Sequence, residues 1–453
     1  EIGARGTLVQ GWLSHVGPAT SRELADVLGS SRDAIEEAAL RLEASGWALR
    51  GSFAGHAPAE DVEWCERRLL ARIHRLTLGA LRREIAPVTS AEFMRWLTDW
   101  QHLSRGAQTV GERGLLEVLR QLQGFEAPAS AWESQILARR VTRYDPDDLD
   151  RLCLTGAVGW GRLSPHPATL DAASTTSPRR VVPTSVAPIT FFVRDDADWM
   201  AHARRADASE PTGLGHPARD VLDRLRQSGA SFFSDLVRGT GRLKAEVEAA
   251  LWELTAAGLV TADGFDNLRA LVDPRRRAGQ GSGRTARPRH STGRWSLLHP
   301  TVDVDRTQTI EAACHMLLRR YGVVFRELLA RESVLPPWRD LLIGFRRLED
   351  RGDIRGGRFV NGFIGEQFAT PTAVASLRAM RHRPPTGEAL TFSAADPLNL
   401  VGIIVPGERV AAVSGRTVTL RDGVPVVAMT TSSAAATLPA MSVVAAPAHG
   451  PIE

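Results

Sequence analysis

The sequence predicts a mainly α-helical fold with α+β units: tandem winged-helix domains followed by a C-terminal β-barrel module. Three observations predict it. A leucine followed four residues later by glycine recurs along the chain, helix-like sequence precedes each copy, and strand-like alternation begins near residue 389. The predicted domains are winged helices at 1–55, 110–163, 214–272 and 294–384, a helical connector at 56–109, a linker with a strand at 164–213, a basic disordered linker at 273–293, and the β-barrel module at 385–453.

The glycine pattern predicts the wings. LRLEASGWALRGSF (40–53), LWELTAAGLVTADGF (251–265) and RRLEDRGDIRGGRF (346–359) share it, and DRLCLTGAVGWGRL (150–163) is a weaker copy. A glycine at this position can take the left-handed conformation that ends a helix. We expect each helix to end there and two short strands to pair around a glycine turn.

Helix signals stand upstream of each wing. In the first unit Leu8, Trp12 and Leu13 indicate one helix, and Thr20 or Ser21 caps a second that runs through Leu28. Ser30 or Ser31 caps a third, from Asp33 to Ala44. This order of helices before a wing is that of the winged helix-turn-helix, and the other units repeat it.

Other segments connect the units. Two helices are expected over 59–102, the first long and rich in arginine, and a strand over 189–194. After residue 389 the strings LTFSA, LVGIIV, RVAAVSG, TVTLRDG and VPVVAMT predict strands, with a hairpin turn at Asp422–Gly423.

Composition excludes several classes of protein. The 453 residues include 43% hydrophobic and 24% charged residues, which is ordinary for a globular protein. Three distant cysteines favour neither a disulfide framework nor a cysteine-based zinc site, and they suit a reducing cytoplasm. We find no apolar run long enough for a membrane span and no secretory signal. Because the chain starts without Met and enters helix-like sequence at once, we expect a fragment of a longer protein.

Arginines on the helix before the wing, and on the wing itself, are the candidate nucleic-acid contacts. In many winged helices that helix enters the major groove, and glycine lets the wing approach phosphates. The alternative for each arginine is simple solvation or a protein contact. The second unit carries DPDDLD at the helix position, so it is expected to be a structural or protein-contact unit. The third has few basic groups on its wing and is expected to be structural. The candidates are Arg32 and Arg50 in the first unit, Arg339, Arg346, Arg347, Arg355 and Arg358 in the fourth, and Arg275, Arg276 and Arg277 in the basic linker.

Catalytic motifs are scarce. The chain has no phosphate-binding loop of the G-x-x-x-x-G-K-[ST] type and no histidine array typical of metal sites. Two residues could still carry chemistry on a flipped base, Gln367 in GEQFA and Asp396 in ADPLN. The alternatives are an ordinary hydrogen-bonding glutamine and a turn-forming aspartate before Pro397.

Several long strings resemble the C-terminal region of the bacterial large helicase-related (Lhr) family, with arginine usage that suggests an actinobacterial version. They are EWCERRLLARIHRLTLGALRREIAPV, MRWLTDWQH, AWESQILARRV, LDRLCLTGAVGWGRL, GRWSLL, IRGGRFVNGFIGEQFATP and ADPLNLVGIIVPGERV. The resemblance implies winged helices similar to those of AlkZ-type alkylpurine DNA glycosylases. Gln367–Phe368–Ala369 keeps only the first two positions of the glutamine motif of that type.

The resemblance also implies functions. In the Lhr family an N-terminal core is a DNA-dependent ATPase and 3′-to-5′ helicase, so ATP and Mg²⁺ are expected only for that core and no cofactor for this chain. It further implies single- or double-stranded DNA as a partner, contact with the helicase core of the same chain, and self-association, with a tetramer as one form. We expect a DNA-binding and oligomerisation module of a cytoplasmic repair helicase. The alternatives are a uracil or alkyl-base DNA glycosylase and a protein-interaction scaffold.

Overall fold

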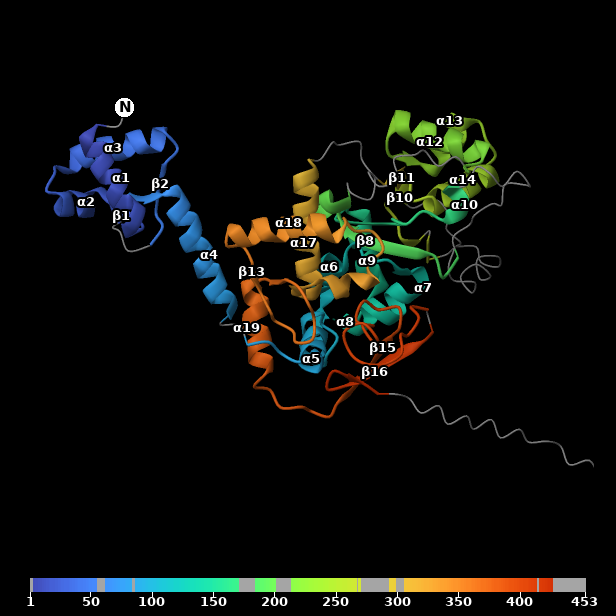
Figure 1. Cartoon of the computed structure of the whole chain (residues 1–453). Helices are drawn as coiled ribbons and strands as arrows, with labels where there is room; N and C mark the ends of the chain where they lie inside the picture. The colour runs from blue at the N-terminus through green and yellow to red at the C-terminus, as the bar shows by residue number, and fades with distance from the viewer. Residues whose placement is uncertain are drawn as a thin grey trace, which may run out of the picture.

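The computed structural model describes residues 3–54, 62–83, 86–170, 184–200, 213–266, 268–269, 293–298, 305–413 and 415–426. Four winged-helix units, A to D in chain order, follow one another (Figure 1). In each unit a short strand precedes the second helix and pairs with the last strand of the wing, which gives four three-stranded sheets with that last strand at the centre. The predicted tandem of winged helices is therefore confirmed.

Unit A stands apart from the rest of the chain (Figure 1). Its helices bury Val9, Leu13, Ile35 and Leu42 in a core of their own. Thr20 caps the second helix in a reciprocal arrangement with Glu23. The unit comprises α1 (Ala4–Val16), β1 (Ala19–Thr20), α2 (Ser21–Leu28), α3 (Arg32–Ala44), β2 (Ala48–Gly51) and β3 (Glu63–Glu66).

Two connector helices lead from unit A to the body of the molecule. They are α4 (Arg67–Arg83), which lies against β13 of unit D, and α5 (Ser90–Trp100). The carboxylate of Glu66 accepts hydrogen bonds from the backbone N–H groups of Arg68 and Leu69, so it caps α4 instead of pairing with an arginine on that helix.

Unit B follows the connector and contains a π-helical stretch within its second helix. Its elements are α6 (Gly111–Leu122), β5 (Ala127–Pro128), α7 (Ala129–Ala131), η1 (Trp132–Leu137), α8 (Ala138–Arg140), α9 (Pro146–Leu154), β7 (Val158–Gly161) and β8 (Pro188–Val193). A separate pair of parallel strands, β4 (Thr109–Val110) and β6 (Val141–Thr142), flanks α6. The helices α10 (Pro167–Leu170) and η2 (Arg194–Met200) lie before and after β8.

Unit C shares one hydrophobic core with unit B. The hydroxyl of Thr261 on its wing donates to the carbonyl oxygen of Trp160 on the wing of unit B, at 2.5 Å. The rings of Trp160 and Trp295 meet edge to face, with centroids 6.5 Å apart. Unit C comprises α12 (His216–Ser228), β9 (Ser231–Phe232), α13 (Phe233–Thr240), α14 (Lys244–Ala256), β10 (Val260–Ala262) and β11 (Arg294–Leu297).

Unit D packs with α5 and the C-terminal segment in the largest core. It comprises α17 (Arg306–Tyr321), β12 (Val323–Val324), η3 (Arg326–Arg331), α18 (Trp338–Asp350), β13 (Arg355–Gly357) and β14 (Gln367–Ala369), followed by α19 (Pro371–Met380). None of the helices in the described ranges has the length and apolar character that a membrane span requires.

The wings differ from the prediction in their second strands. β3 lies in the segment predicted as a helical connector, β8 in the predicted linker, and β11 in the segment predicted as the fourth winged helix. The reason is that the strands of one wing are separated by long excursions, 162–187 in unit B and 263–293 in unit C. Tight glycine hairpins were expected because they are the commonest local solution.

The C-terminal segment forms a three-stranded antiparallel sheet of β15 (Ala389–Ser393), β16 (Thr417–Arg421) and β17 (Val424–Pro425). In the described residues this sheet does not close, so the predicted barrel is not confirmed. The hairpin at Asp422–Gly423 is confirmed, with positive φ angles at both residues. The string LVGIIV (400–405), predicted as a strand, forms turns with one isolated bridge between Val401 and Val405.

Candidate nucleic-acid interface

The helix α18 of unit D separates an apolar face from a basic one. Leu341, Phe345 and Leu348, at the spacing of successive turns, are fully buried. After them Gly352 adopts a φ angle of 84°, and the N–H of Asp353 donates to the carbonyl oxygen of Leu348 at 3.0 Å. The opposite face is exposed and carries Arg339, Ile343, Arg346 and Arg347.

The wing of unit D is held close to the end of α18. The buried carboxylate of Glu349 accepts a hydrogen bond from the N–H of Gly356 at 3.1 Å. A Cβ at position 356 would lie 2.6 Å from that carboxylate, so any larger residue would have to displace the Glu349 side chain. On either side of this contact Arg355 and Arg358 are exposed.

Four of these arginines form what we call the arginine patch: Arg339, Arg347, Arg355 and Arg358. Within the described ranges none of the four has a hydrogen bond or ion pair with a side chain of the protein. Such guanidinium groups are available for phosphate oxygens, which they can bind in bidentate fashion.

Two neighbouring arginines are neutralised. The guanidinium of Arg346 bonds the carboxylate of Glu366 through two nitrogens, at 2.9 and 2.7 Å. Arg351 pairs with Glu311 and Asp353, and its hydrogen bonds hold the pKa of the Glu311 carboxyl below its usual value. Of the five arginines predicted in this unit, Arg346 is therefore the one already engaged by an acid.

The predicted arginines of unit A lie in a more acidic setting. Arg50 pairs with Glu43 at 3.0 Å. Arg32 shares the exposed face of α3 with Asp33, Glu36 and Glu37. This face offers phosphate less net attraction than α18 does.

Units B and C present no comparable surface among the described residues. Every residue of β7 and of β10 is buried, because the two wings pack on one another. The helix α9 also begins with the acids that the sequence placed there, Asp147 and Asp148. This geometry is consistent with the expectation that units B and C do not form the DNA contact.

The connector helix α4 extends the basic surface. Arg67, Arg68, Arg72 and Arg75 on it are exposed, and the helix lies along the wing of unit D. His74 of α4 lies 3.8 Å from Asp350 at the end of α18. A polyanion bound to the arginine patch therefore has further cations nearby. Arg275, Arg276 and Arg277, the other predicted contacts, lie outside the described residues.

Gln367, predicted as a catalytic candidate, supports the wing from inside. It is 1% exposed. Its Oε1 accepts hydrogen bonds from the N–H groups of Phe359 and Val360, both at 2.8 Å, and its Nε2 donates to the carbonyl oxygen of Val360 at 2.9 Å. With these bonds made, the amide is not free to meet a substrate, and the geometry gives Gln367 a structural role.

Asp396, the other catalytic candidate, is fully buried in an ion pair. Its carboxylate receives two hydrogen bonds from Arg140, at 2.6 and 2.8 Å, and one from the N–H of Leu398 at 2.9 Å. The last bond is the turn expected of an aspartate before proline. This pair fastens the C-terminal segment to the second helix of unit B, so its geometry also indicates a structural role.

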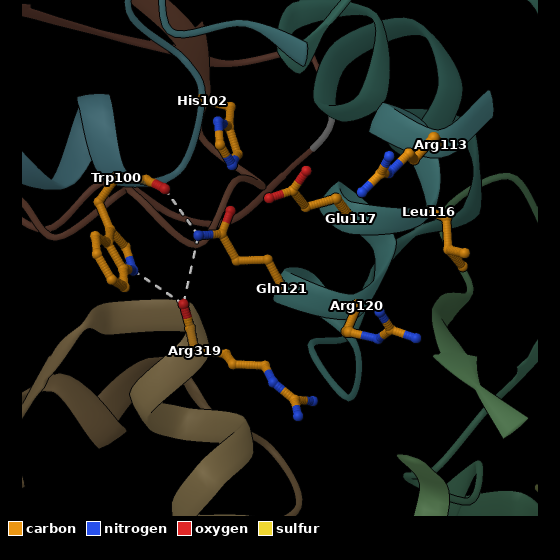
Figure 2. Close-up of a pocket in the computed structure, with 8 residues that line it drawn as sticks. All are labelled: Trp100, His102, Arg113, Leu116, Glu117, Arg120, Gln121 and Arg319. Atoms are coloured by element: carbon orange, nitrogen blue, oxygen red, sulfur yellow. Dashed lines mark hydrogen bonds between the residues drawn. The ribbon is translucent and has the colours of Figure 1, made fainter. Parts of the chain in front are cut away.

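A cavity of about 600 Å³ lies elsewhere, between α5, α6 and α17 (Figure 2). The amide of Gln121 stands in it. Its Nε2 donates to the carbonyl oxygens of Trp100, at 2.8 Å, and Arg319, at 3.4 Å. These bonds fix the amide orientation, and Oε1 is left buried without a partner among the described residues. The lining residues are Trp100, His102, Arg113, Leu116, Glu117, Arg120, Gln121 and Arg319.

This cavity was not predicted from the sequence, although a signal is present. Arg113, Glu117, Arg120 and Gln121 recur at the spacing of one helix face, which is polar where α6 faces other elements. Arg120 and Arg319 share the carboxylate of Asp196, each at 2.9 Å. The cavity thus offers the carboxylate of Glu117 and several arginines to a small polar molecule.

Two parts of the chain match models of a known protein family. Two models described as "Large helicase-related protein, winged-helix domain" match the chain. The third-domain model matches 88–176, which includes α5 and unit B except for its last strand, β8, and the fourth-domain model matches 303–389, which includes unit D. Unit C lies between the two matched ranges.

Two curated relatives match most of the chain. One is "Lhr helicase/ probable uracil glycosylase" of Mycolicibacterium smegmatis, 30% identical over 422 residues that cover 88% of this chain and 26% of the relative. The other is "Lhr helicase/uracil glycosylase" of Escherichia coli, 28% identical over 396 residues that cover 77% of this chain and 24% of the relative. The chain thus spans about a quarter of the length of these relatives. Together the matches identify the chain as a winged-helix region related to the C-terminal part of the large helicase-related proteins.

Proposed function

We propose that this chain is the DNA-binding region of an Lhr-type repair helicase, and that α18 and the wing of unit D form its main DNA contact. The observation that carries the proposal is the arginine patch, four exposed guanidinium groups without acidic partners among the described residues. The relatives' printed names, which call them helicases, support the link to DNA.

In this proposal α18 lies in the major groove and the wing follows the phosphate backbone. Arg339 and Arg347 lie on the exposed face of the helix, where they reach base edges or phosphates. Arg355 and Arg358 contact phosphates beside the glycines of the wing. ATP and Mg²⁺ act at a helicase core of the kind that the relatives' names indicate, and self-association of the winged-helix region, in the cytoplasm, belongs to the same proposal.

Charge reversal tests this assignment. In Arg347→Glu/Arg355→Glu we expect affinity for a labelled duplex, measured by fluorescence anisotropy, to fall more than tenfold, because two phosphate contacts become repulsions. The matched control is Arg41→Glu/Arg50→Glu in unit A. Both control arginines already pair with acids, at 2.5 and 3.0 Å, and we expect little change there. Equal losses in the two variants would contradict the assignment to unit D, and absence of any DNA binding would favour a protein scaffold.

Base excision is a second candidate, favoured by the relatives' printed names and by the cavity in Figure 2. Glu117 is the carboxylate among the lining residues of this cavity, and its side chain is exposed. A carboxylate near the sugar can position water for hydrolysis of the glycosidic bond.

The test for excision is the yield of abasic sites in uracil-containing DNA after alkali. We expect Glu117→Gln to abolish the product. Asp396→Asn should give the same yield of abasic sites per folded molecule as the unmodified protein. If the unmodified protein yields no abasic sites, or if Asp396→Asn alone abolishes them, the cavity is not the site of excision.

A further inference from the structure

The tip of the unit D wing exposes an isoleucine. Ile364 is 91% exposed, more than any other large hydrophobic side chain in the described residues. Gly362 and Gly365 flank the tip and take φ angles of 92° and 106°, which place the backbone in a sharp turn. An isoleucine exposed at the end of a turn contributes no burial energy to the free protein, so its apolar surface is available for burial when the protein binds a partner.

The base of this loop is rigid. The amide of Gln367 bonds three backbone groups of Phe359 and Val360. Val88 joins the loop from outside: its N–H donates to the carbonyl oxygen of Phe359, and its own carbonyl oxygen accepts from Asn361, both at 2.8 Å. Ile364 is therefore presented on a preorganised support rather than on a loose loop.

The neighbouring residue secures the tip as well. The ring of Phe363 packs on Phe325, with centroids 4.7 Å apart. Of the two apolar residues between the glycines, one is thus anchored in the core and the other points to solvent. This division fixes the direction in which Ile364 projects.

The surroundings of Ile364 suit nucleic acid better than protein. The exposed residues next to it in sequence are Asn361, Gly362 and Gly365, with Arg358 at the start of the loop, so its sequence neighbours add no apolar surface. Protein docking sites usually bury a contiguous apolar patch. A single aliphatic side chain beside phosphate-binding arginines matches proteins that insert an apolar wedge between base pairs.

We propose that Ile364 inserts between adjacent bases of duplex DNA and unstacks them when unit D binds. This proposal rests on the DNA-binding function proposed above. The arginine patch would supply the attraction to phosphate, and the isoleucine would convert bound duplex into a locally opened one, a step that both strand separation and base extrusion require.

The test uses the complete chain and a series of short duplexes in which 2-aminopurine replaces each adenine in turn. The fluorescence of 2-aminopurine rises when its stacking is lost. At saturating protein we expect a clear rise at one or two neighbouring positions. With Ile364→Ala the rise should disappear and affinity should fall by roughly tenfold. With Ile364→Leu, which keeps the apolar volume, most of the fluorescence rise and most of the affinity should be retained.

Two controls separate the possible failures. Leu243→Ala removes another exposed aliphatic side chain, 72% exposed at the start of α14 in unit C, and should leave signal and affinity unchanged. If Ile364→Ala at saturation still produces the rise in fluorescence, or if the unmodified chain binds the duplex without any rise, the wedge proposal is wrong while the DNA-binding proposal stands. Absence of duplex binding by the unmodified chain overturns both proposals.

Discussion

The buried pair of Arg140 and Asp396 gives the sharpest prediction about stability. Both side chains are 0% exposed, and the two ionic hydrogen bonds measure 2.6 and 2.8 Å. Arg140 also donates to Gln101 Oε1, at 3.2 Å, while its Nε has no partner among the described residues. Asp396→Asn keeps the shape and the turn but leaves the guanidinium charge without a counter-charge.

The expected cost follows from that change. Removing one partner of a buried ion pair destabilises a protein by about 3–5 kcal/mol, because the remaining charge stays desolvated. For a body of this size that corresponds to a fall in melting temperature of roughly 10 °C. Arg140→Met/Asp396→Leu removes both charges, and we expect it to recover most of the loss.

Thermal unfolding, followed by circular dichroism, measures the effect. Unit A serves as an internal reference because its core is separate, so its unfolding should not shift. If Asp396→Asn melts at the temperature of the unmodified protein but yields no abasic sites from uracil-containing DNA, the structural assignment of Asp396 is wrong and a catalytic one is required.

Three further predictions concern packing and the wing. Gly258→Ala should lower the free energy of unfolding in urea more than Gly156→Ala does. Both glycines have positive φ angles, of 73° and 80°, but only at Gly258 would a Cβ meet backbone, 2.8 Å from the carbonyl oxygen of Arg162. Equal losses of free energy in the two variants would contradict the contact between units B and C. Gln367→Leu should cost about 2–4 kcal/mol and open the wing to trypsin, since two buried N–H groups lose their acceptor; an unchanged digestion pattern would argue against this role. Burial raises the pKa of the Cys153 thiol to about 12. Because the neutral thiol is the form that the folded protein buries, its contribution to the free energy of unfolding is fully present below the unfolded pKa near 9 and is lost as pH rises toward 12. The buried thiol of the native protein should resist alkylation at pH 9. Rapid labelling at that pH would show that the thiol is accessible.

Local signals predicted the repeating part of the fold. Gly46, Gly156, Gly258 and Gly352 all take positive φ angles between the third helix of a unit and the first strand of its wing. The helix ends, the capping residue Thr20 and the turn at Asp422–Gly423 depend on neighbours in sequence, so the sequence alone could reveal them.

Contacts between residues that are distant in sequence could not be predicted from these local signals. The second strands β8 and β11 return after long excursions, and nothing local states which earlier strand they meet. The same holds for Arg140 and Asp396, which come from different domains of the predicted organisation. Whether an arginine is free or paired, as for Arg347 and Arg346, depends on where acids lie in space rather than on the arginine itself.

The exposed position of Ile364 was not predicted from the sequence. An isoleucine between glycines in GFIGE could be an ordinary turn residue, and only the packing of Phe363 and the bonds of Gln367 show that it projects from a fixed support. The catalytic prediction for Gln367 arose from the same string. The position is important to the wing, although through hydrogen bonds to the backbone.

The salt dependence of DNA binding tests the role of the arginine patch most directly. Each phosphate contact contributes a slope of about −0.9 to the logarithm of the binding constant against the logarithm of salt concentration. In a variant with Arg339, Arg347, Arg355 and Arg358 all replaced by glutamine, we predict a slope shallower by about 3 to 4 than that of the unmodified chain. An unchanged slope would contradict the assignment, because it would place the phosphate contacts on other arginines.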